Sequence, residues 1–317
     1  MRAVIFDRGL AWLDPARPVP VPGPGEALIR VVLAGVCATD HALLRGYADF
    51  SGIPGHEFVG LVASAPDEPA WEGKRVVGEI TVGCGRCVPC LNRDRGHCLN
   101  RGVVGIRHRD GVFADWVTLP VVNLHAVPAG VGDRAALFVE PLAAALEIVQ
   151  QTYVRPTDRV AVVGDGKLGL LVAQVLALTG CELTLIGRHP RPWLEARGIG
   201  VREASRLAEG WRADLVVECS GTPEGLTLAR GLVRARGRLV LKSTHAAATA
   251  VDLASWVVDE IVVLGSRCGP FPAALRLLER GLVVVEPLIG AIFSLDDAMG
   301  ALTKSREKGT LKIVLQP

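Results

Sequence analysis

Residues 159–180 read RVAVVGDGKLGLLVAQVLALTG, an apolar run that reaches a glycine-rich turn and continues as an Ala/Leu-rich segment. The turn has the spacing G-x-G-x-x-G, formed by Gly164, Gly166 and Gly169. The first glycine allows a tight turn, the second lets the backbone approach a pyrophosphate, and the third permits close packing of helix on strand. Because this spacing follows a predicted strand and opens a predicted helix, it indicates a dinucleotide site.

Residues on both sides of this turn are candidates to contact the cofactor. The predicted helix begins at Lys167 and Leu168, whose N–H groups would face the phosphates. The next predicted strand, ELTLIG, ends at Gly187 and is followed by Arg188 and His189. An acid about 20 residues after the glycines would hold a free ribose 2′-hydroxyl, whereas a glycine beside an arginine would accept a 2′-phosphate. We therefore favour NADP(H) over NAD(H), although Arg188 could also be a surface residue in an NAD enzyme.

Strand-like and helix-like segments alternate along the rest of this region. Further strand-like runs occupy 214–221 (DLVVECSG), 238–243 (RLVLKS) and 260–266 (EIVVLGS). Such alternation predicts an α/β fold with a doubly wound parallel sheet, over residues 142–269. Residues 1–141 instead resemble short strands separated by Pro- and Gly-rich turns, and the tail, 270–317, is expected to rejoin them.

Residues 83–98, GCGRCVPCLNRDRGHC, hold four of the eight cysteines of the chain. Their spacing is C-x2-C-x2-C-x7-C, and they are Cys84, Cys87, Cys90 and Cys98. The first residues, MRAVIFDRGLAW, lack the uncharged run of an export signal, so we expect a cytoplasmic protein with reduced thiols. Short Cys-x2-Cys steps then favour a structural Zn²⁺ site over the alternative, a disulfide.

The bulk composition excludes some classes of partner. The formal net charge of the 317 residues is +2, which gives no reason to expect binding to nucleic acid. The longest nearly apolar stretch, LGLLVAQVLALTGC at 168–181, is too short to span a bilayer. We therefore expect a small-molecule substrate, with neither nucleic acid nor a membrane as partner.

A second group of potential metal ligands is scattered along the chain. Cys37 lies in GVCATDH, His56 and Glu57 lie in PGHEFVG, and Glu140 lies in FVEPLA. Soft, borderline and hard donors of these kinds suit a catalytic Zn²⁺ that keeps an open coordination position. Spacing alone does not establish such a site, because the groups are far apart in the sequence.

The ordered motifs GVCATD, PGHEFVG, the four-cysteine lobe, VEPLA and VVGDGKLG resemble those of the zinc-dependent medium-chain dehydrogenase/reductase (alcohol dehydrogenase) superfamily. The likeness is to its polyol-, threonine- and glucose-dehydrogenase-like branch and covers almost the whole chain. It implies a GroES-like β-rich catalytic domain (1–141 and 270–317, with the zinc lobe 83–98) and a Rossmann domain (142–269). It also implies a homodimer or homotetramer, joined through the edge strand at 260–268.

The resemblance also implies roles for the residues around the catalytic metal. Cys37 and His56 would be fixed ligands of a catalytic zinc, the second zinc of the chain, and Glu57 and Glu140 would be ligands or exchange with water. The resemblance implies that zinc lowers the pKa of the substrate hydroxyl and that hydride then passes to the nicotinamide.

Three further residues are assigned by the same resemblance, and a fourth is left open. Thr39 would accept the substrate proton, Asp40 would hold the second nitrogen of His56, and Lys312 would contact the cofactor pyrophosphate. His41 stands one position before the histidine that ends the proton relay in many relatives, so its role is left open.

The function expected from these observations is hydride transfer between a nicotinamide cofactor and an alcohol, polyol or sugar, or the matching carbonyl. The alternatives are a threonine-like or biosynthetic alcohol dehydrogenase or reductase, and a non-catalytic nucleotide-binding zinc protein. Four apolar side chains near the motifs are candidates for the substrate pocket, although they could equally belong to the core: Tyr47, Phe50, Ile106 and Trp116.

Overall fold

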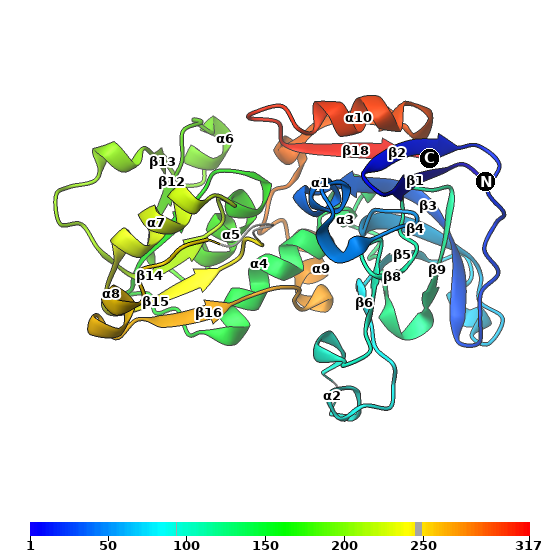
Figure 1. The fold of residues 1–317 in the computed structure, drawn as a ribbon, viewed down its shortest axis with the longest axis horizontal. Helices are drawn as coiled ribbons and strands as arrows, with labels where there is room; N and C mark the ends of the chain where they lie inside the picture. The colour runs from blue at the N-terminus through cyan, green and yellow to red at the C-terminus, as the bar shows by residue number, and fades with distance from the viewer. Residues whose placement is uncertain (93, 245–248) are drawn as a thin grey trace. The chain divides into compact units, whose positions relative to one another are not determined.

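The structure, a computed structural model, describes residues 1–92, 94–244 and 249–317. The chain forms two compact units (Figure 1). The first comprises Met1–Glu140 and Phe271–Pro317, and the second comprises Pro141–Pro270.

A seven-stranded sheet forms the centre of the first unit. Its order is β10-β5-β4-β3-β18-β17, and β9 also pairs with β3. The strands are β3 (Glu26–Val36), β4 (Glu57–Ser64), β5 (Arg75–Gly78), β9 (Trp116–Pro120), β10 (Leu124–Ala126), β17 (Ile289–Ser294) and β18 (Lys312–Gln316). Because β18 pairs antiparallel with β3, the C-terminal segment completes a sheet that the N-terminal segment begins.

The sequence of β3, EALIRVVLAGV, explains how this sheet is buried. Ala27, Ile29 and Val31 are buried and alternate with more exposed residues, so one face of the strand packs into the core. The last four residues, 33–36, are all buried, so both faces are covered where the strand approaches Cys37.

The remaining elements of the first unit surround this sheet. They are the hairpin of β1 (Ala3–Asp7) and β2 (Leu10–Asp14), and the helices α1 (Ala38–Leu44), α3 (Asp133–Ala136), α9 (Phe271–Glu279) and α10 (Ala298–Lys304). The cysteine-rich lobe contains β6 (Thr81–Val82), α2 (Val88–Leu91), β7 (Gly102–Val104) and β8 (His108–Arg109). In Figure 1 the loop around α2 projects from the rest of this unit.

The second unit holds a six-stranded parallel sheet with the order β13-β12-β11-β14-β15-β16. Its strands are β11 (Arg159–Val163), β12 (Glu182–Ile186), β13 (Val201–Arg202), β14 (Ala213–Glu218), β15 (Val233–Leu241) and β16 (Val262–Gly265). In chain order this is 3-2-1-4-5-6, the order of dinucleotide-binding Rossmann folds, with the topological switch between β11 and β14. The predicted fold class is thus confirmed.

The helices of this unit alternate with its strands. They are α5 (Lys167–Ala177), α6 (Pro192–Glu195), α7 (Pro223–Leu232) and α8 (Leu253–Val258), and α4 (Val139–Gln151) enters from the first unit. Among the described residues, no helix has the length and apolar character needed to cross a bilayer.

Candidate active site and cofactor site

Three potential metal ligands come together in the first unit. Cys37 follows β3 and precedes α1, while His56 and Glu57 stand where β4 begins. Because β3 and β4 are antiparallel and Gly35 pairs with Glu57, the register brings the end of β3 beside the start of β4. Donor atoms of Cys37, His56 and Glu57 all lie within 4.8 Å of one another. A thiolate, an imidazole and a carboxylate this close together fit a Zn²⁺ ion with an open coordination position.

Asp40, in the first turn of α1, faces the ring of His56. Its Oδ1 lies 3.6 Å from Nδ1 of His56, and both atoms are buried without a hydrogen-bond partner in the described part of the chain. Oδ2 of Asp40 accepts a hydrogen bond of 2.8 Å from the backbone N–H of Cys37. Burial disfavours a charge on the ring, but the Asp40 carboxylate outweighs it and the pKa of His56 rises to about 10. The surroundings of His56 therefore stabilise a positive charge beside Cys37. Binding of a metal ion requires such an environment.

Glu57 is paired with a buried lysine. Its Oε2 accepts a hydrogen bond from Nζ of Lys312, and the two side chains are 1% and 2% exposed. Although burial opposes the charged form, Glu57 raises the pKa of Lys312 above its ordinary value. Nζ also lies 3.5 Å from the carbonyl oxygen of Val36.

This pairing argues against the predicted role of Lys312. An ammonium group that is enclosed by the core and bound to Glu57 has no exposed face for a cofactor pyrophosphate. Nor is Lys312 a surface lysine, since its side chain is 2% exposed.

Two other predicted residues lie around the cluster. Oγ1 of Thr39 lies 3.8 Å from Sγ of Cys37. Glu140, in the first turn of α4, is near enough to act electrostatically on His56. Its carboxylate is not among the three groups whose donors lie within 4.8 Å of one another. Among the described residues, Glu57 is therefore the carboxylate grouped with Cys37 and His56.

His41 contacts the segment that ends α10. Its Nε2 lies 2.7 Å from Oγ of Ser305, and its Nδ1 accepts a hydrogen bond of 3.3 Å from Nε of Arg306. Both ring nitrogens are thus engaged by the C-terminal segment, which does not support a proton relay through His41.

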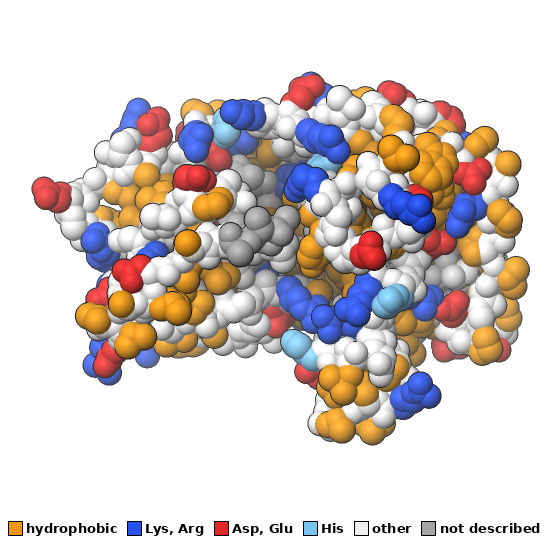
Figure 2. Space-filling model, viewed as in Figure 1, with side chains coloured by type: hydrophobic (Ala, Val, Ile, Leu, Met, Phe, Trp, Pro, Cys, Tyr) orange, Lys and Arg blue, Asp and Glu red, His pale blue; other side chains and the backbone are white. Residues whose placement is uncertain are grey.

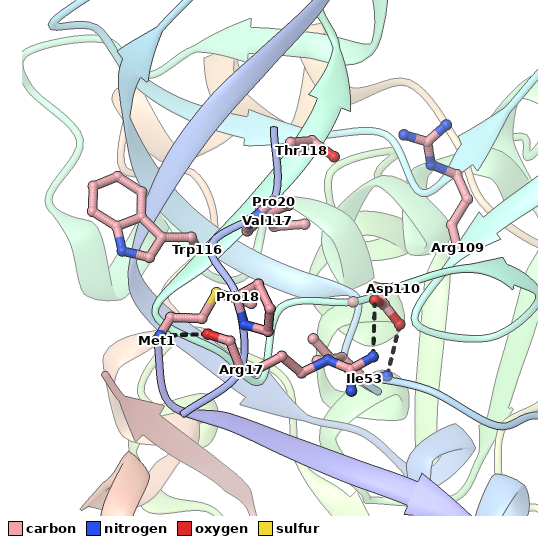
Figure 3. Close-up of a pocket in the computed structure, with 11 residues that line it drawn as sticks. Met1, Arg17, Pro18, Pro20, Ile53, Arg109, Asp110, Trp116, Val117 and Thr118 are labelled. Atoms are coloured by element: carbon pink, nitrogen blue, oxygen red, sulfur yellow. Dashed lines mark hydrogen bonds and ion pairs between the residues drawn. The ribbon is translucent and has the colours of Figure 1, made fainter. Parts of the chain in front are cut away.

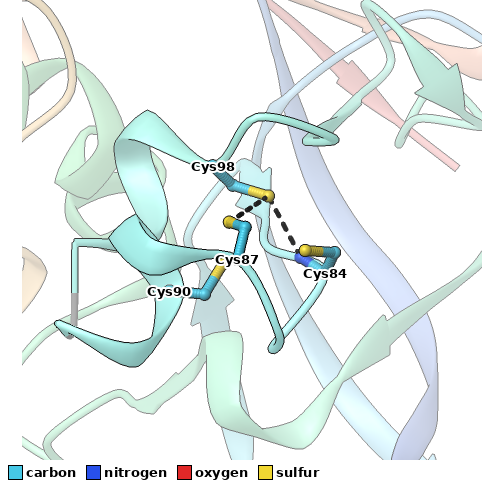
Figure 4. Close-up of side chains that lie close together, drawn as sticks. All are labelled: Cys84, Cys87, Cys90 and Cys98. Carbon is cyan, nitrogen blue, oxygen red and sulfur yellow. Dashed lines mark hydrogen bonds between the residues drawn. The ribbon is translucent and has the colours of Figure 1, made fainter.

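Four thiols meet in the lobe of residues 83–98 (Figure 4). The Sγ atoms of Cys84, Cys87, Cys90 and Cys98 all lie within 4.8 Å of one another, and those of Cys87 and Cys98 are 3.7 Å apart. Tetrahedral Zn–S bonds of ~2.3 Å would place sulfurs about 3.8 Å apart, whereas a disulfide needs ~2.05 Å. All eight cysteines are free thiols. The lobe therefore fits a four-thiolate zinc site and not the disulfide alternative.

Backbone N–H groups lower the pKa of Cys84 and Cys87 and so favour their thiolate forms, whereas burial raises the pKa of Cys90 to about 11. Sγ of Cys98 accepts hydrogen bonds of 3.2 Å from the N–H of Cys84 and 3.3 Å from the N–H of Asn100. Hydrogen bonds from the N–H groups of Arg86 and Cys87 lower the pKa of Cys84 to about 6. Thiolates are the form that binds a metal.

The glycine-rich turn links β11 to α5 in the second unit. Gly164 has a φ of 111°, in the left-handed region that favours glycine. A Cβ on Gly169 would lie 1.9 Å from the carbonyl oxygen of Gly164, so only glycine allows this packing of helix on strand. A Cβ on Gly166, just before α5, would meet nothing within 4 Å. The open space at this helix N-terminus fits a pyrophosphate held by the N–H groups of Lys167 and Leu168.

Asp165, an acid that was not among the predicted cofactor residues, lies beside the turn that follows β12. Oδ2 of Asp165 accepts hydrogen bonds from the backbone N–H of Arg188 at 2.9 Å and of His189 at 2.7 Å. Nδ1 of His189 lies 2.9 Å from the same oxygen. Asp165 belongs to the turn after β11, and the parallel pairing of β11 with β12 brings it to this place. The one signal in the sequence was the charged residue between two glycines of the turn.

The turn after β12 also carries unpaired positive charge. Arg188 is exposed, and its guanidinium has no hydrogen-bond or ion-pair partner among the described residues. Nε of Arg191 is buried and likewise lacks a hydrogen-bond partner within the described chain. Figure 2 shows basic side chains and a histidine gathered over the segment around α6. An exposed guanidinium without a partner, such as that of Arg188, suits a phosphate.

Of the four predicted pocket residues, Trp116 alone lines the cavity that the structure describes. Trp116 and Asp110 both line this cavity of about 220 Å³ (Figure 3). Phe50 and Ile106 pack against the core of the first unit, and Tyr47 is 40% exposed. Cys37, His56 and Glu57 are not among the residues that line this cavity.

Comparisons with known proteins cover both units. Residues 23–129 match the alcohol dehydrogenase GroES-like domain family. The chain is 31% identical to erythritol/L-threitol dehydrogenase of Mycolicibacterium smegmatis, over 94% of this chain and 92% of that protein.

Two solved structures resemble the chain over its full length. One, described as a zinc-binding dehydrogenase of Sinorhizobium meliloti 1021 bound to NADP, is 28% identical, with a TM-score of 0.89 over 100% of this chain and 99% of that one. The other, a short chain alcohol dehydrogenase of Escherichia coli CFT073 complexed with NADH, is 25% identical, with a TM-score of 0.90 over 100% and 99%.

Proposed function

The chain belongs to the zinc-type medium-chain dehydrogenase/reductase superfamily and is an NAD(P)-dependent dehydrogenase, and we propose that its substrate is an alcohol, polyol or sugar, or the matching carbonyl. The observation that carries this proposal is the cluster of Cys37, His56 and Glu57, together with the open helix N-terminus after Gly166. A relative named for erythritol and L-threitol supports the polyol class.

The residues around Cys37 suit the handling of a hydroxyl group. Cys37 and His56 would hold a catalytic Zn²⁺, which when bound supplies a Lewis acid for the substrate oxygen. Asp40 faces Nδ1 of His56 at 3.6 Å, and with a metal bound it would orient the ring and leave Nε2 as the ligand. Thr39, beside Cys37, would accept the hydrogen of the substrate hydroxyl.

Glu57 is the third candidate ligand. The ammonium of Lys312 competes for its carboxylate, which suits a ligand that exchanges with water or substrate. Glu140 remains the alternative carboxylate, since its charge acts on His56.

The four-cysteine lobe would hold a second, structural Zn²⁺, so that the chain carries two. The close Sγ atoms and the N–H groups that stabilise thiolates support this assignment. Eight free thiols are also typical of proteins of the reducing cytoplasm, where we place the enzyme.

The cofactor preference follows from the turn after β12. Within the described chain, the free guanidinium of Arg188 and the unpaired Nε of Arg191 support NADP(H) as the favoured cofactor. A charge-assisted contact to the 2′-phosphate contributes roughly 1.5–3 kcal/mol, or about one to two decades of affinity. We therefore expect kcat/KM for NADP to exceed that for NAD by at least about tenfold.

Arg188→Ala tests this preference. The change should lower kcat/KM for NADP by about tenfold and leave that for NAD nearly unchanged. Arg206→Ala, an exposed arginine of the same unit, is the matched control and should alter neither value. The measurement is the initial rate of nicotinamide reduction with each cofactor, on the best substrate from a screen of alcohols, polyols and sugars. Equal or better use of NAD by the unchanged enzyme would contradict the preference. Gly187→Asp would introduce an acid at the end of β12, but it is unsuitable as a test of this preference. The new Cβ at position 187 would lie 2.4 Å from Cγ of Asp165.

We further propose a homodimer or homotetramer joined at the edge of the second unit. β16 ends the sheet, and in the described chain its outer edge has no strand partner. Val262 on β16 is 51% exposed, and Val257 and Val258 of α8 are 76% and 80% exposed. An open edge flanked by apolar side chains suits pairing with a second copy across a twofold axis.

Light scattering at micromolar concentration is expected to give a mass of two or four chains. Val258→Glu should shift the mass toward one chain, since a charge would be buried in the interface. Val122→Glu, at a valine of the first unit that is 59% exposed, should not change the mass. A strictly monomeric unchanged protein would contradict the proposal.

A further inference from the structure

The side chain of Asp165 joins the glycine-rich turn to the turn after β12. One carboxylate oxygen, Oδ2, accepts the backbone N–H groups of two successive residues, Arg188 and His189, at 2.9 and 2.7 Å. The ring of His189 contacts the same oxygen, with Nδ1 at 2.9 Å. A single carboxylate therefore fixes the backbone of both residues that follow Gly187.

The environment of Asp165 strengthens these contacts. Its side chain is 14% exposed, which limits screening by water. Burial alone would raise the pKa of Asp165, but the N–H groups of His189 and Arg188 outweigh it and the pKa is below its ordinary value. The carboxylate is thus ionised at neutral pH, and its hydrogen bonds are of the stronger, charge-assisted kind.

Gly187 leaves the space that Asp165 occupies. A Cβ at position 187 would lie 2.4 Å from both Cβ and Cγ of Asp165. An acid at the end of the second strand and an acid between the first two glycines therefore exclude one another here. In this chain the acid stands in the turn, and its oxygen faces backbone N–H groups.

We propose that Asp165 is a positioning residue for recognition of the adenosine 2′-phosphate, acting by holding the backbone of residues 188–189 so that Arg188 presents its guanidinium to that phosphate. This inference rests on the proposed use of NADP(H). The competing arrangement is an acid that binds the ribose hydroxyls and repels a 2′-phosphate. It is disfavoured because Oδ2 already accepts two backbone N–H groups and contacts Nδ1 of His189, which holds the carboxylate against the backbone of residues 188–189.

Binding of adenosine fragments to the purified full-length protein tests the inference without turnover. Calorimetry would compare adenosine 2′,5′-bisphosphate with adenosine 5′-monophosphate, which differ by the 2′-phosphate alone. Asp165→Ala should weaken binding of the bisphosphate about tenfold and change the affinity for the monophosphate by no more than about twofold. Asp165→Asn keeps an acceptor oxygen in place and should retain most of the affinity for the bisphosphate. In an Arg188→Ala background, Asp165→Ala should have no further effect on the bisphosphate.

The outcomes separate this inference from the cofactor proposal. Bisphosphate binding by Asp165→Ala as tight as that of the unchanged protein would overturn the role of Asp165 alone. Tighter bisphosphate binding by Asp165→Asn would overturn it too, because the carboxylate would then be repelling the phosphate. If the unchanged protein does not distinguish the two fragments, the NADP(H) proposal fails, and this inference fails with it.

Discussion

Cys37→Ser is expected to lower kcat/KM by about a thousandfold or more, because the Lewis acid at this site contributes several kcal/mol to the hydride-transfer step. The thiolate is the soft donor of the cluster, and a serine hydroxyl is a poor zinc ligand near neutral pH. Cys37 lies at the junction of β3 and α1, where the smaller oxygen should be tolerated without unfolding. The measurements are kcat/KM, zinc per chain and thermal unfolding.

Cys181→Ser is the matched control for this change. Its thiol is also partly buried, and it faces the carbonyl oxygen of Leu176 at 3.5 Å, a contact that a hydroxyl can make. This variant should keep its activity and its zinc. Full activity of Cys37→Ser would show that the cluster of Cys37, His56 and Glu57 is not the site of chemistry.

Cys87→Ser is expected to lower the free energy of unfolding by about 4 kcal/mol or more, through loss of the structural zinc. Within the described residues of the lobe 83–98, the buried ones are Cys90 and Cys98. Val88, Leu91 and Leu99, within or just after the lobe, are 69%, 68% and 76% exposed. The described residues of the lobe therefore form no apolar core of their own, and we expect its folding to depend on the metal.

Zinc analysis and denaturant unfolding check this expectation. Cys87→Ser should lose one zinc per chain and the stability together, whereas Cys181→Ser should lose neither. Protein purified without chelator that holds no zinc at this lobe, or a variant as stable as the unchanged protein, would contradict the assignment.

Much of the fold could be predicted from local sequence. Hydrophobic periodicity and the spacing of the glycines indicate the strand, turn and helix around Gly164. The alternation of strand-like and helix-like segments that follows predicts the parallel sheet. The cysteine lobe is equally local, since all four thiols lie within residues 84–98. The closeness of Cys37 to His56 was different: it followed from family resemblance, and its physical cause is the antiparallel register of β3 and β4.

The contacts that local sequence does not predict join residues that lie far apart along the chain. Lys312 was assigned to the cofactor, yet it pairs with Glu57 because β18 lies beside β3. The role of His41 could not be predicted from its position one residue before the relay histidine of many relatives. Its partners, Ser305 and Arg306, are in the C-terminal segment. Asp165 is not indicated by the sequence, because the acid of such sites is expected on the second strand and contact across neighbouring strands has no local signature.

Removal and return of the metal tests the central claim most directly. The purified protein would be assayed for NADP reduction with a panel of alcohols, polyols and sugars, then treated with a chelator and supplied with Zn²⁺ again. We expect turnover with at least one secondary alcohol or polyol, loss of that turnover as zinc leaves the Cys37 site, and recovery when zinc returns. Turnover that persists in protein shown to contain no zinc would contradict a metal-dependent dehydrogenase built on Cys37, His56 and Glu57.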